Sequence, residues 1–231
     1  MKDFKEGLLA GIPIGLGYLS VSFTFGIMAV GTGLYWWQAT IISMLTVTSA
    51  GQLAGIGTMI HPGLYMEMLI SQITINIRYS FMSISIGQKA DEKFSGIYRW
   101  LLGFMMTDEI FGVASSKREV SRSFFGGLCV FPYLGWFLGT LIGALLGEVL
   151  PASLLSALGI ALYAMFIAIV VPEMEKSTPV IIVVIVAIIL SCSFKYFPLL
   201  QGVSSGIAIT ICGVLASLVG AIFFPVEEAE S

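Results

Sequence analysis

Long runs of apolar residues, interrupted at short intervals by Gly, Pro or charged residues, dominate the pattern along this chain. A run of about 20 mostly apolar residues lets one helix cross a hydrocarbon core of roughly 30 Å. The pattern gives eight candidate spans: 9–31, 39–60, 64–87, 98–113, 124–147, 152–172, 179–194 and 203–224. Only helices and closed barrels satisfy their backbone polar groups inside lipid. We therefore expect an all-α integral membrane protein with seven or eight transmembrane helices.

The basic loops 88–99 and 114–123 flank the candidate span 98–113. A single crossing would place these loops on opposite sides, although Lys and Arg gather on the cytoplasmic side. Eight residues, 100–107, precede two acidic residues, and they give only about 12 Å of helix. Either this segment is broken or re-entrant with both loops cytoplasmic, or the span continues through 116 with both acids inside it. The re-entrant option leaves seven crossings and an external N-terminus.

A short internal similarity links GIPIGLGYLSVSFTFG (11–26) with VFPYLGWFLGTLIG (130–143). Many secondary transporters are built from such repeats. We treat 1–231 as a single transmembrane domain whose halves, 9–123 and 124–224, are candidates for repeats. Chance similarity between two glycine-rich spans is the alternative.

Composition removes several classes of function. Hydrophobic residues make up 57% of the chain and charged residues 11%, against about a quarter charged in soluble domains. The 11 Lys and Arg residues are scattered and the net charge is −3, so no basic face for nucleic acid is expected. Cys129, Cys192 and Cys212 lie in apolar stretches without the spacing of a disulfide framework or zinc site.

Several motifs for enzymatic chemistry are absent from the sequence, which contains no HExxH, Walker-type or dinucleotide-binding pattern. His61, the one histidine, precedes Pro62 at a span boundary and is given no role. We expect neither an enzyme, nor a cofactor, nor a metal site.

The candidate span 64–87 is too polar to face lipid on all sides. Two stripes follow helical spacing, one with Gln72, Asn76, Tyr79 and Ser83, the other with Glu67, Ser71 and Arg78. Arg78 could clamp a carboxylate through two hydrogen bonds, and Asn76 can both donate and accept. The alternatives for Arg78 are snorkelling or an ion pair with Asp108 or Glu109, and for Asn76 an interhelical hydrogen bond.

Asp108 and Glu109 are the first candidates for chemistry within the bilayer. An ionisable group at membrane depth costs about 2.5 kcal/mol or more and usually marks a pathway. Removal from water favours the neutral carboxyl group, which lets it exchange protons near neutral pH. The alternative is a helix end in water.

Small and hydroxyl residues gather around Gln52 in TVTSAGQLAGIG (46–57). Such a segment, which includes Gly51, permits local unwinding that exposes backbone groups to a ligand, or else close helix packing. Phe23 and Phe25 in the first span could line an apolar pocket. We expect Gln52, together with Asn76 and Asp108, to face one central cavity.

Four motifs resemble the AzlC family, the large subunit of bacterial branched-chain amino-acid exporters, along nearly the whole chain. They are G-x-P-x-G with a later F-G (Gly11, Pro13, Gly15, Phe25, Gly26), S-A-G-Q (Ser49–Gln52), I-N-I-R-Y (Ile75–Tyr79) and T-D-E (Thr107–Glu109). The resemblance implies a permease of the bacterial cytoplasmic membrane that exports valine, leucine, isoleucine or similar amino acids. It also implies a small AzlD-like membrane subunit as partner. Tyr79 departs from the family, where His is frequent, which puts a proton role for that position in doubt.

The leading hypothesis is a proton-coupled secondary exporter of apolar amino acids. A zwitterion needs donors for its carboxylate, such as helix N-termini or Arg78, and acceptors for its ammonium, such as Asp108 or Asn76. The candidate substrate-binding residues are Phe25, Gly51, Gln52, Asn76, Arg78 and Asp108, and the proton-coupling candidates are Asp108 and Glu109. A permease or channel for another small solute, or a non-transporting membrane subunit of a complex, remain as alternatives.

Overall fold

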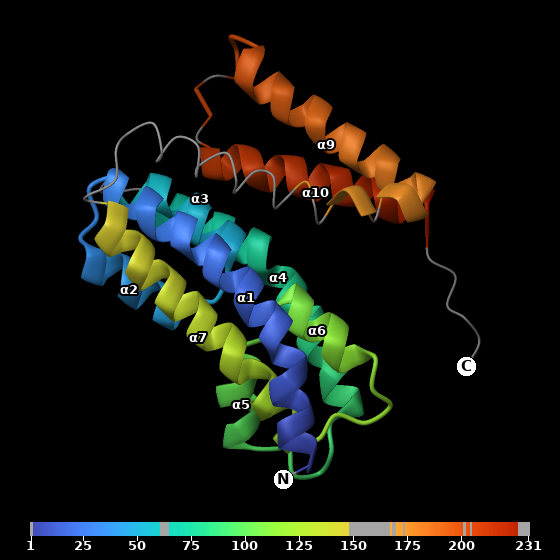
Figure 1. Cartoon of the computed structure of the whole chain (residues 1–231). Coiled ribbons are helices and arrows are strands. Elements are labelled where there is room, and N and C mark those ends of the chain that lie inside the picture. Colours follow the sequence, from blue (N-terminus) through green and yellow to red (C-terminus); the bar gives the residue numbers. More distant parts are fainter. Residues whose placement is uncertain are drawn as a thin grey trace. The chain divides into compact units, whose positions relative to one another are not determined.

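The computed structural model describes residues 2–60, 65–147, 167, 170–172, 174–200, 202–203 and 205–225. These residues are helical throughout, apart from turns and one isolated bridge between Ala90 and Val120, which confirms the all-α prediction. The helices are α1 (Lys2–Gly31), α2 (Trp36–Leu45), α3 (Ser49–Met59), α4 (Tyr65–Lys89), α5 (Ile97–Gly103), α6 (Asp108–Ser115), α7 (Arg122–Gly147), α9 (Thr178–Tyr196) and α10 (Ser205–Phe223) (Figure 1).

The chain forms two compact units. The first comprises Met1–Ile56 with Asn76–Leu162, and the second Gly57–Ile75 with Tyr163–Ser231. The boundary divides α4, a continuous helix, so that its second half belongs to the first unit. These units do not coincide with the halves 9–123 and 124–224, whose relationship stays a prediction.

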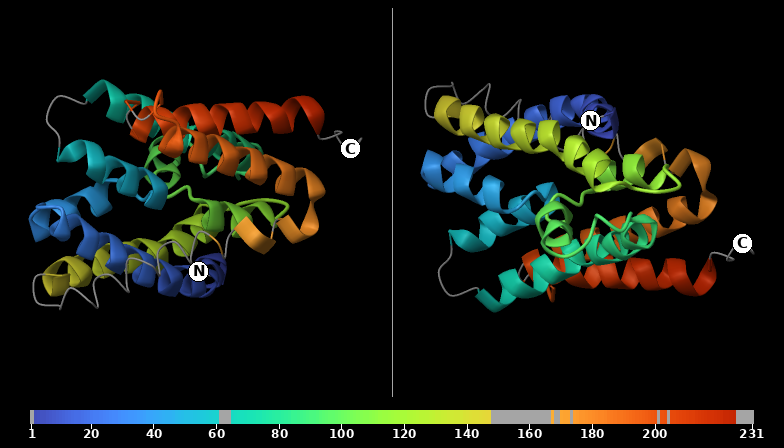
Figure 2. Two further views of the ribbon diagram at one scale, coloured as in Figure 1. Left: turned by 90° about the horizontal axis from the view of Figure 1, so that it is seen from above. Right: turned by 90° about the horizontal axis from the view of Figure 1, so that it is seen from below.

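In the first unit, α1 and α7 lie side by side and run in the same direction (Figures 1 and 2). Gly7 in α1 contacts the backbone of Phe124 near the start of α7, and Gly26 contacts that of Thr140 near its end. A Cβ atom on Gly135 would lie 2.2 Å from the carbonyl oxygen of Gly15, so the two backbones touch directly. Small residues at four-residue spacing permit this close approach, which explains why both helices are rich in glycine.

The loop before α7 is attached to the start of α1. Lys117 forms an ion pair with Glu6, and the Ser121 hydroxyl donates a hydrogen bond of 3.1 Å to Asp3. We call this end of the α1–α7 pair the amino end and the opposite end, near Gly147, the carboxyl end.

The segment α5–α6 is a hairpin that starts and finishes at the amino end. Near its start, Arg99 donates to the carbonyl oxygen of Gly87 in the last turn of α4, at 3.2 Å. At its finish, the Lys89 ammonium donates to the carbonyl oxygen of Ser115, at 2.7 Å. The backbone of Val120 also pairs with that of Lys89. Residues 97–115 therefore return to the end from which they start, which is the re-entrant arrangement that the short apolar run allowed.

A second hairpin, α2–α3, starts at the carboxyl end. Ala39 in α2 and Ile56 in α3 both belong to the buried cluster that contains Phe25, Ala29 and Ala144. Between Ala39 and Ile56 the chain extends toward the middle of α7, because the Tyr133 hydroxyl donates a hydrogen bond of 3.3 Å to the carbonyl oxygen of Met44. Residues 46–48 are not helical and reverse the direction of the chain. The candidate span 39–60 is therefore interrupted, at the beginning of the segment 46–57 whose composition permits local unwinding.

Four helices in the described part of the chain are long and apolar enough to span a bilayer: α1, α7, α9 and residues Gly206–Phe223 of α10. The expected seven or eight spans are not confirmed, since 39–60 and 98–113 each divide into two short helices. Most of the candidate span 152–172 lies outside the described residues.

In the second unit, α9 and α10 contact each other, with a Cβ on Gly220 placed 3.0 Å from a methyl group of Val183. None of the residues of α9 is buried, and this helix is apolar on all faces, as a position in contact with lipid requires. Glu67 is buried and accepts a hydrogen bond of 2.9 Å from the Gly206 backbone at the start of α10.

The hairpin α2–α3 bears on the orientation of the chain, which the basic loops alone leave open. Three full crossings before residue 88 would have placed the N-terminus opposite the basic loops, but the structure places them at the same end. The amino end thus carries eight of the 11 basic residues, namely Lys2, Lys5, Lys89, Lys93, Arg99, Lys117, Arg118 and Arg122. Basic residues gather on the cytoplasmic side, so we expect the amino end, with the N-terminus, to face the cytoplasm.

Cysteine labelling tests this orientation. With Cys129, Cys192 and Cys212 replaced by Ala, a membrane-impermeant maleimide applied to intact cells should label Thr32→Cys at the carboxyl end but not Ser95→Cys at the amino end. Permeabilised cells should show labelling of both variants. Labelling of Ser95→Cys alone in intact cells would reverse the assigned orientation.

A methyl group placed between α1 and α7 should destabilise the first unit. Gly135→Ala forces apart backbones in contact, and such overpacking costs about 1–3 kcal/mol. Gly17→Ala is the matched control, because no atom lies within 4 Å of the added Cβ. Residual monodisperse protein after heating in detergent, measured by size-exclusion chromatography, should fall only for Gly135→Ala. An equal fraction of monodisperse protein for the two variants after heating would contradict the proposed backbone contact.

Candidate functional site

The tips of the two hairpins reach the middle of the α1–α7 pair. Tyr18 and Trp136, near the centres of α1 and α7, pack edge to face with ring centroids 5.1 Å apart. Val47 from the first tip and Met105 and Met106 from the second belong to the buried cluster around these rings. Since α1 and α7 are candidate membrane spans, both breaks in helical structure fall within the expected bilayer interior.

A threonine caps the helix that leaves each tip. The Thr48 hydroxyl accepts from the Gly51 backbone N–H at the start of α3, and that of Thr107 accepts from the Ile110 N–H at the start of α6, each at 3.4 Å. An N-cap side chain satisfies a backbone donor that has no partner within the helix. The first turns of α3 and α6, with their partial positive charge, are therefore both placed at the middle of the pair.

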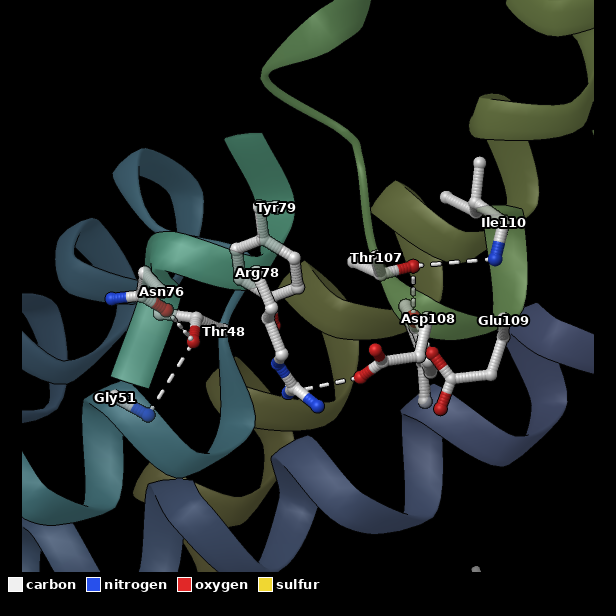
Figure 3. A network of polar contacts seen from close by, with 10 residues as sticks. Thr48, Gly51, Asn76, Arg78, Tyr79, Thr107, Asp108, Glu109 and Ile110 are labelled. Atoms are coloured by element: carbon white, nitrogen blue, oxygen red, sulfur yellow. Dashed lines mark hydrogen bonds and ion pairs between the residues drawn. The ribbon is translucent and has the colours of Figure 1, made fainter. Parts of the chain in front are cut away.

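Arg78 in α4 forms an ion pair with Asp108, the first residue of α6 (Figure 3). One guanidinium nitrogen lies 2.9 Å from one carboxylate oxygen, and the two side chains are 47% and 40% exposed. The same nitrogen donates to the Tyr79 hydroxyl at 3.4 Å, and the guanidinium lies over the Tyr79 ring. This contact matches the alternative that the sequence left open for Arg78, an ion pair with an acidic residue.

Asn76, two residues before Arg78, contacts the other hairpin. Its side-chain oxygen accepts a hydrogen bond of 2.8 Å from the Thr48 hydroxyl (Figure 3). Thus the short segment Asn76–Arg78 touches α3 through one residue and α6 through another. The sequence predicted a central position for this helix, and the described contacts place its second half between the two tips.

Glu109 lies beside Tyr18, which the sequence had not marked as a site residue. The Tyr18 hydroxyl is 2.6 Å from a carboxylate oxygen of Glu109 and 2.5 Å from the Thr107 hydroxyl. A phenol has one proton to donate, so the three groups form a connected hydrogen-bonded chain from α1 to α6. The neighbouring acids therefore differ in partner: the Arg78 cation for Asp108 and the Tyr18 hydroxyl group for Glu109.

Gln52 belongs to a buried network rather than to the group around Arg78. Its amide nitrogen donates to the Ser43 hydroxyl at 2.7 Å, and its amide oxygen accepts from the Trp136 indole at 2.9 Å. Ser43 and Thr140 share a further hydrogen bond of 2.7 Å. With 2% of its surface exposed, Gln52 joins α2, α3 and α7 and fixes the first hairpin.

The structure therefore assembles only part of the expected set of site residues. Asn76, Arg78 and Asp108 lie at the two tips, and Gly51 is buried in the first turn of α3. Phe25 is 2% exposed within the cluster at the carboxyl end, where its ring fills the core rather than lining a cavity at the tips. Within the described residues, no group of three or more His, Cys, Asp or Glu side chains is arranged to hold a metal ion.

Sequence reasoning missed Thr48 and Thr107, although a signal for both was present. Each threonine follows an apolar run and precedes small or acidic residues, which is the pattern of a helix N-cap. Tyr18 and Trp136 carried no such local signal, because their partners lie between 84 and 91 residues away in the sequence.

These features define the class: an integral membrane protein of many helices, with polar and charged side chains brought together by two broken hairpins. The family model described as "AzlC protein" matches residues 13–150, from α1 to beyond α7. An "Uncharacterized membrane protein" of Archaeoglobus fulgidus is 33% identical over 178 residues, which cover 74% of this chain and 76% of that protein. The chain belongs to the AzlC family. No solved structure matches it.

A double-mutant cycle would measure the bond between Gln52 and Trp136. Gln52→Leu and Trp136→Phe should each destabilise the protein, and their coupling energy should fall at about 0.6–1.7 kcal/mol, the range for polar contacts between membrane helices. Gln88→Leu, at an exposed position of α4, should change stability by less than about 0.5 kcal/mol. The measurement is denaturant unfolding in micelles, and strict additivity would argue against this network.

Proposed function

We propose that this protein is a transporter subunit that exports branched-chain or similar apolar amino acids across the bacterial cytoplasmic membrane, driven by the proton gradient. Membership of the AzlC family supports a membrane protein with a transport-related role. A small AzlD-like subunit would complete the transporter, as the resemblance of the sequence motifs implies.

The observation that carries this proposal is the half-exposed ion pair between Arg78 and Asp108 at the tip of a re-entrant hairpin. Charged side chains at membrane depth are expensive and usually serve a pathway. Secondary transporters commonly place substrate sites where helices are interrupted near the bilayer midplane, because first-turn amides and unwound backbone can contact the ligand there.

The surroundings of this pair suit a ligand with an apolar side chain. Val47, Met105 and Met106 belong to the buried apolar cluster at the tips, and the proposal assigns them the apolar wall that the ligand side chain would meet once it displaces the ion pair. Methionine side chains adapt their shape, which fits a group of related aliphatic substrates rather than one rigid ligand. These residues replace Phe25 in the proposal, since that ring belongs to the carboxyl-end core.

Proton coupling is assigned to the two acids at the start of α6. Asp108 is the leading candidate, because protonation would release Arg78 and thereby change the contact between α4 and the hairpin. Glu109 is the second candidate, through its hydrogen bond with Tyr18.

Asp108→Asn should abolish proton-driven export. Cells loaded with labelled valine, and expressing the protein with its small subunit, should lose gradient-dependent efflux in this variant, because the amide can neither carry a proton nor pair with a cation. Glu6→Gln, which removes an ion pair at the amino end, should retain efflux close to that of the wild type. Unchanged efflux for Asp108→Asn would remove this residue from the mechanism.

A further inference from the structure

The ion pair between Arg78 and Asp108 is chemically incomplete. A guanidinium carries five N–H donors and can bind a carboxylate through two parallel bonds. Here only one nitrogen meets one carboxylate oxygen, and the other described contacts of Arg78 are with the hydroxyl group and the ring of Tyr79. Both charges therefore retain hydrogen-bonding capacity, and both side chains remain close to half exposed.

The two charged groups also belong to separate backbone elements. Arg78 is carried by α4, whereas Asp108 starts α6 after the non-helical residues 104–107. α5 has no buried residue, and Trp100 within it is 82% exposed. By contrast, the first hairpin is fixed by the buried side chains around Gln52. Because Arg78 reaches Asp108 through a long, half-exposed side chain, the pair can separate through a change of side-chain conformation, without movement of the buried residues Ile110 and Ala114 in α6.

We propose that the Arg78–Asp108 pair is an internal substitute for the two charges of an α-amino acid. On binding, the substrate carboxylate takes the place of Asp108 on the guanidinium, and the substrate ammonium takes the place of Arg78 on the carboxylate. The number of charge contacts is conserved or increased, so no charge is left unpaired in the bilayer interior. This inference rests on the proposed function and specifies which charges the substrate must carry.

Selectivity for zwitterions follows directly. A ligand with a carboxylate alone would satisfy Arg78 but leave Asp108 without its cation, and a ligand with an amine alone would do the reverse. At the expected depth in the bilayer, a charge that loses its partner is left uncompensated, which is unfavourable. Such ligands are therefore rejected by the charge left unpaired rather than by their shape.

Three ligands with the same branched carbon chain separate these charges: valine, 3-methylbutanoate, which lacks the amine, and 2-methylpropylamine, which lacks the carboxylate. Their binding to the purified complex in detergent is measured by calorimetry. Wild-type protein should bind valine about ten- to a hundredfold more tightly than either analogue, a factor equivalent to one charge-assisted hydrogen bond.

The variants should change this preference in opposite directions. Asp108→Asn leaves Arg78 without a counter-ion and should gain binding of 3-methylbutanoate, whereas Arg78→Gln should gain binding of 2-methylpropylamine. A gain of binding cannot arise from misfolding, so these results report on the site itself. Glu6→Gln, which breaks the ion pair at the amino end, should preserve the wild-type order of affinities.

The outcomes distinguish this inference from the function on which it rests. Absence of valine binding to the wild-type complex would contradict the proposed function. Two results would contradict the proposed substitution of charges: equal affinity of the wild-type complex for valine and a single-charge analogue, or variants that no longer bind valine and bind neither analogue. Neither result would contradict amino-acid export.

Discussion

The whole arrangement depends on satisfying polar backbone groups where two helices are interrupted inside an apolar protein. Unpaired N–H and C=O groups are expensive in lipid, so a broken helix at this depth must be surrounded by protein or line a wet cavity. Thr48 and Thr107 cap the helices that resume after each break, and the close contact of α1 with α7 supplies a compact wall behind them. Polar side chains thus gather at the tips of the two hairpins because the interrupted backbone there needs hydrogen-bonding partners.

The two hairpins are held in different ways. The first is fixed by neutral hydrogen bonds among Ser43, Gln52 and Trp136, which are buried. The second is held at its tip by the charged pair of Arg78 and Asp108 and by the contact of Tyr18 with Thr107 and Glu109. Neutral bonds in a closed core do not respond to a change of one proton, whereas a charged pair does. Of the two tips, the second is therefore the one with a charged pair among its described contacts.

Part of this organisation could be read from the sequence. The run before Asp108 was too short to cross a bilayer, so a broken segment was foreseeable from length alone. For 39–60, the composition of 46–57 permitted local unwinding, but hydropathy continues through the break and gave no sign that the chain reverses there. The role of Gln52 also escaped prediction, since its partner Trp136 is 84 residues away and such long-range contacts leave no local pattern. Without the hairpin α2–α3 the basic residues gave no consistent topology, since the re-entrant option placed Lys2 and Lys5 opposite the basic loops.

The positions of the family motifs also follow from this geometry. S-A-G-Q forms the first turn of α3, T-D-E caps and begins α6, and I-N-I-R-Y lies on α4 where Asn76 reaches one tip and Arg78 the other. Three short motifs that are separated along the chain thus come together at the tips of the two hairpins. Each break requires specific capping and pairing residues, whereas the apolar stretches between them need only be hydrophobic and of suitable length. Short motifs separated by apolar stretches are what this physical division of roles predicts.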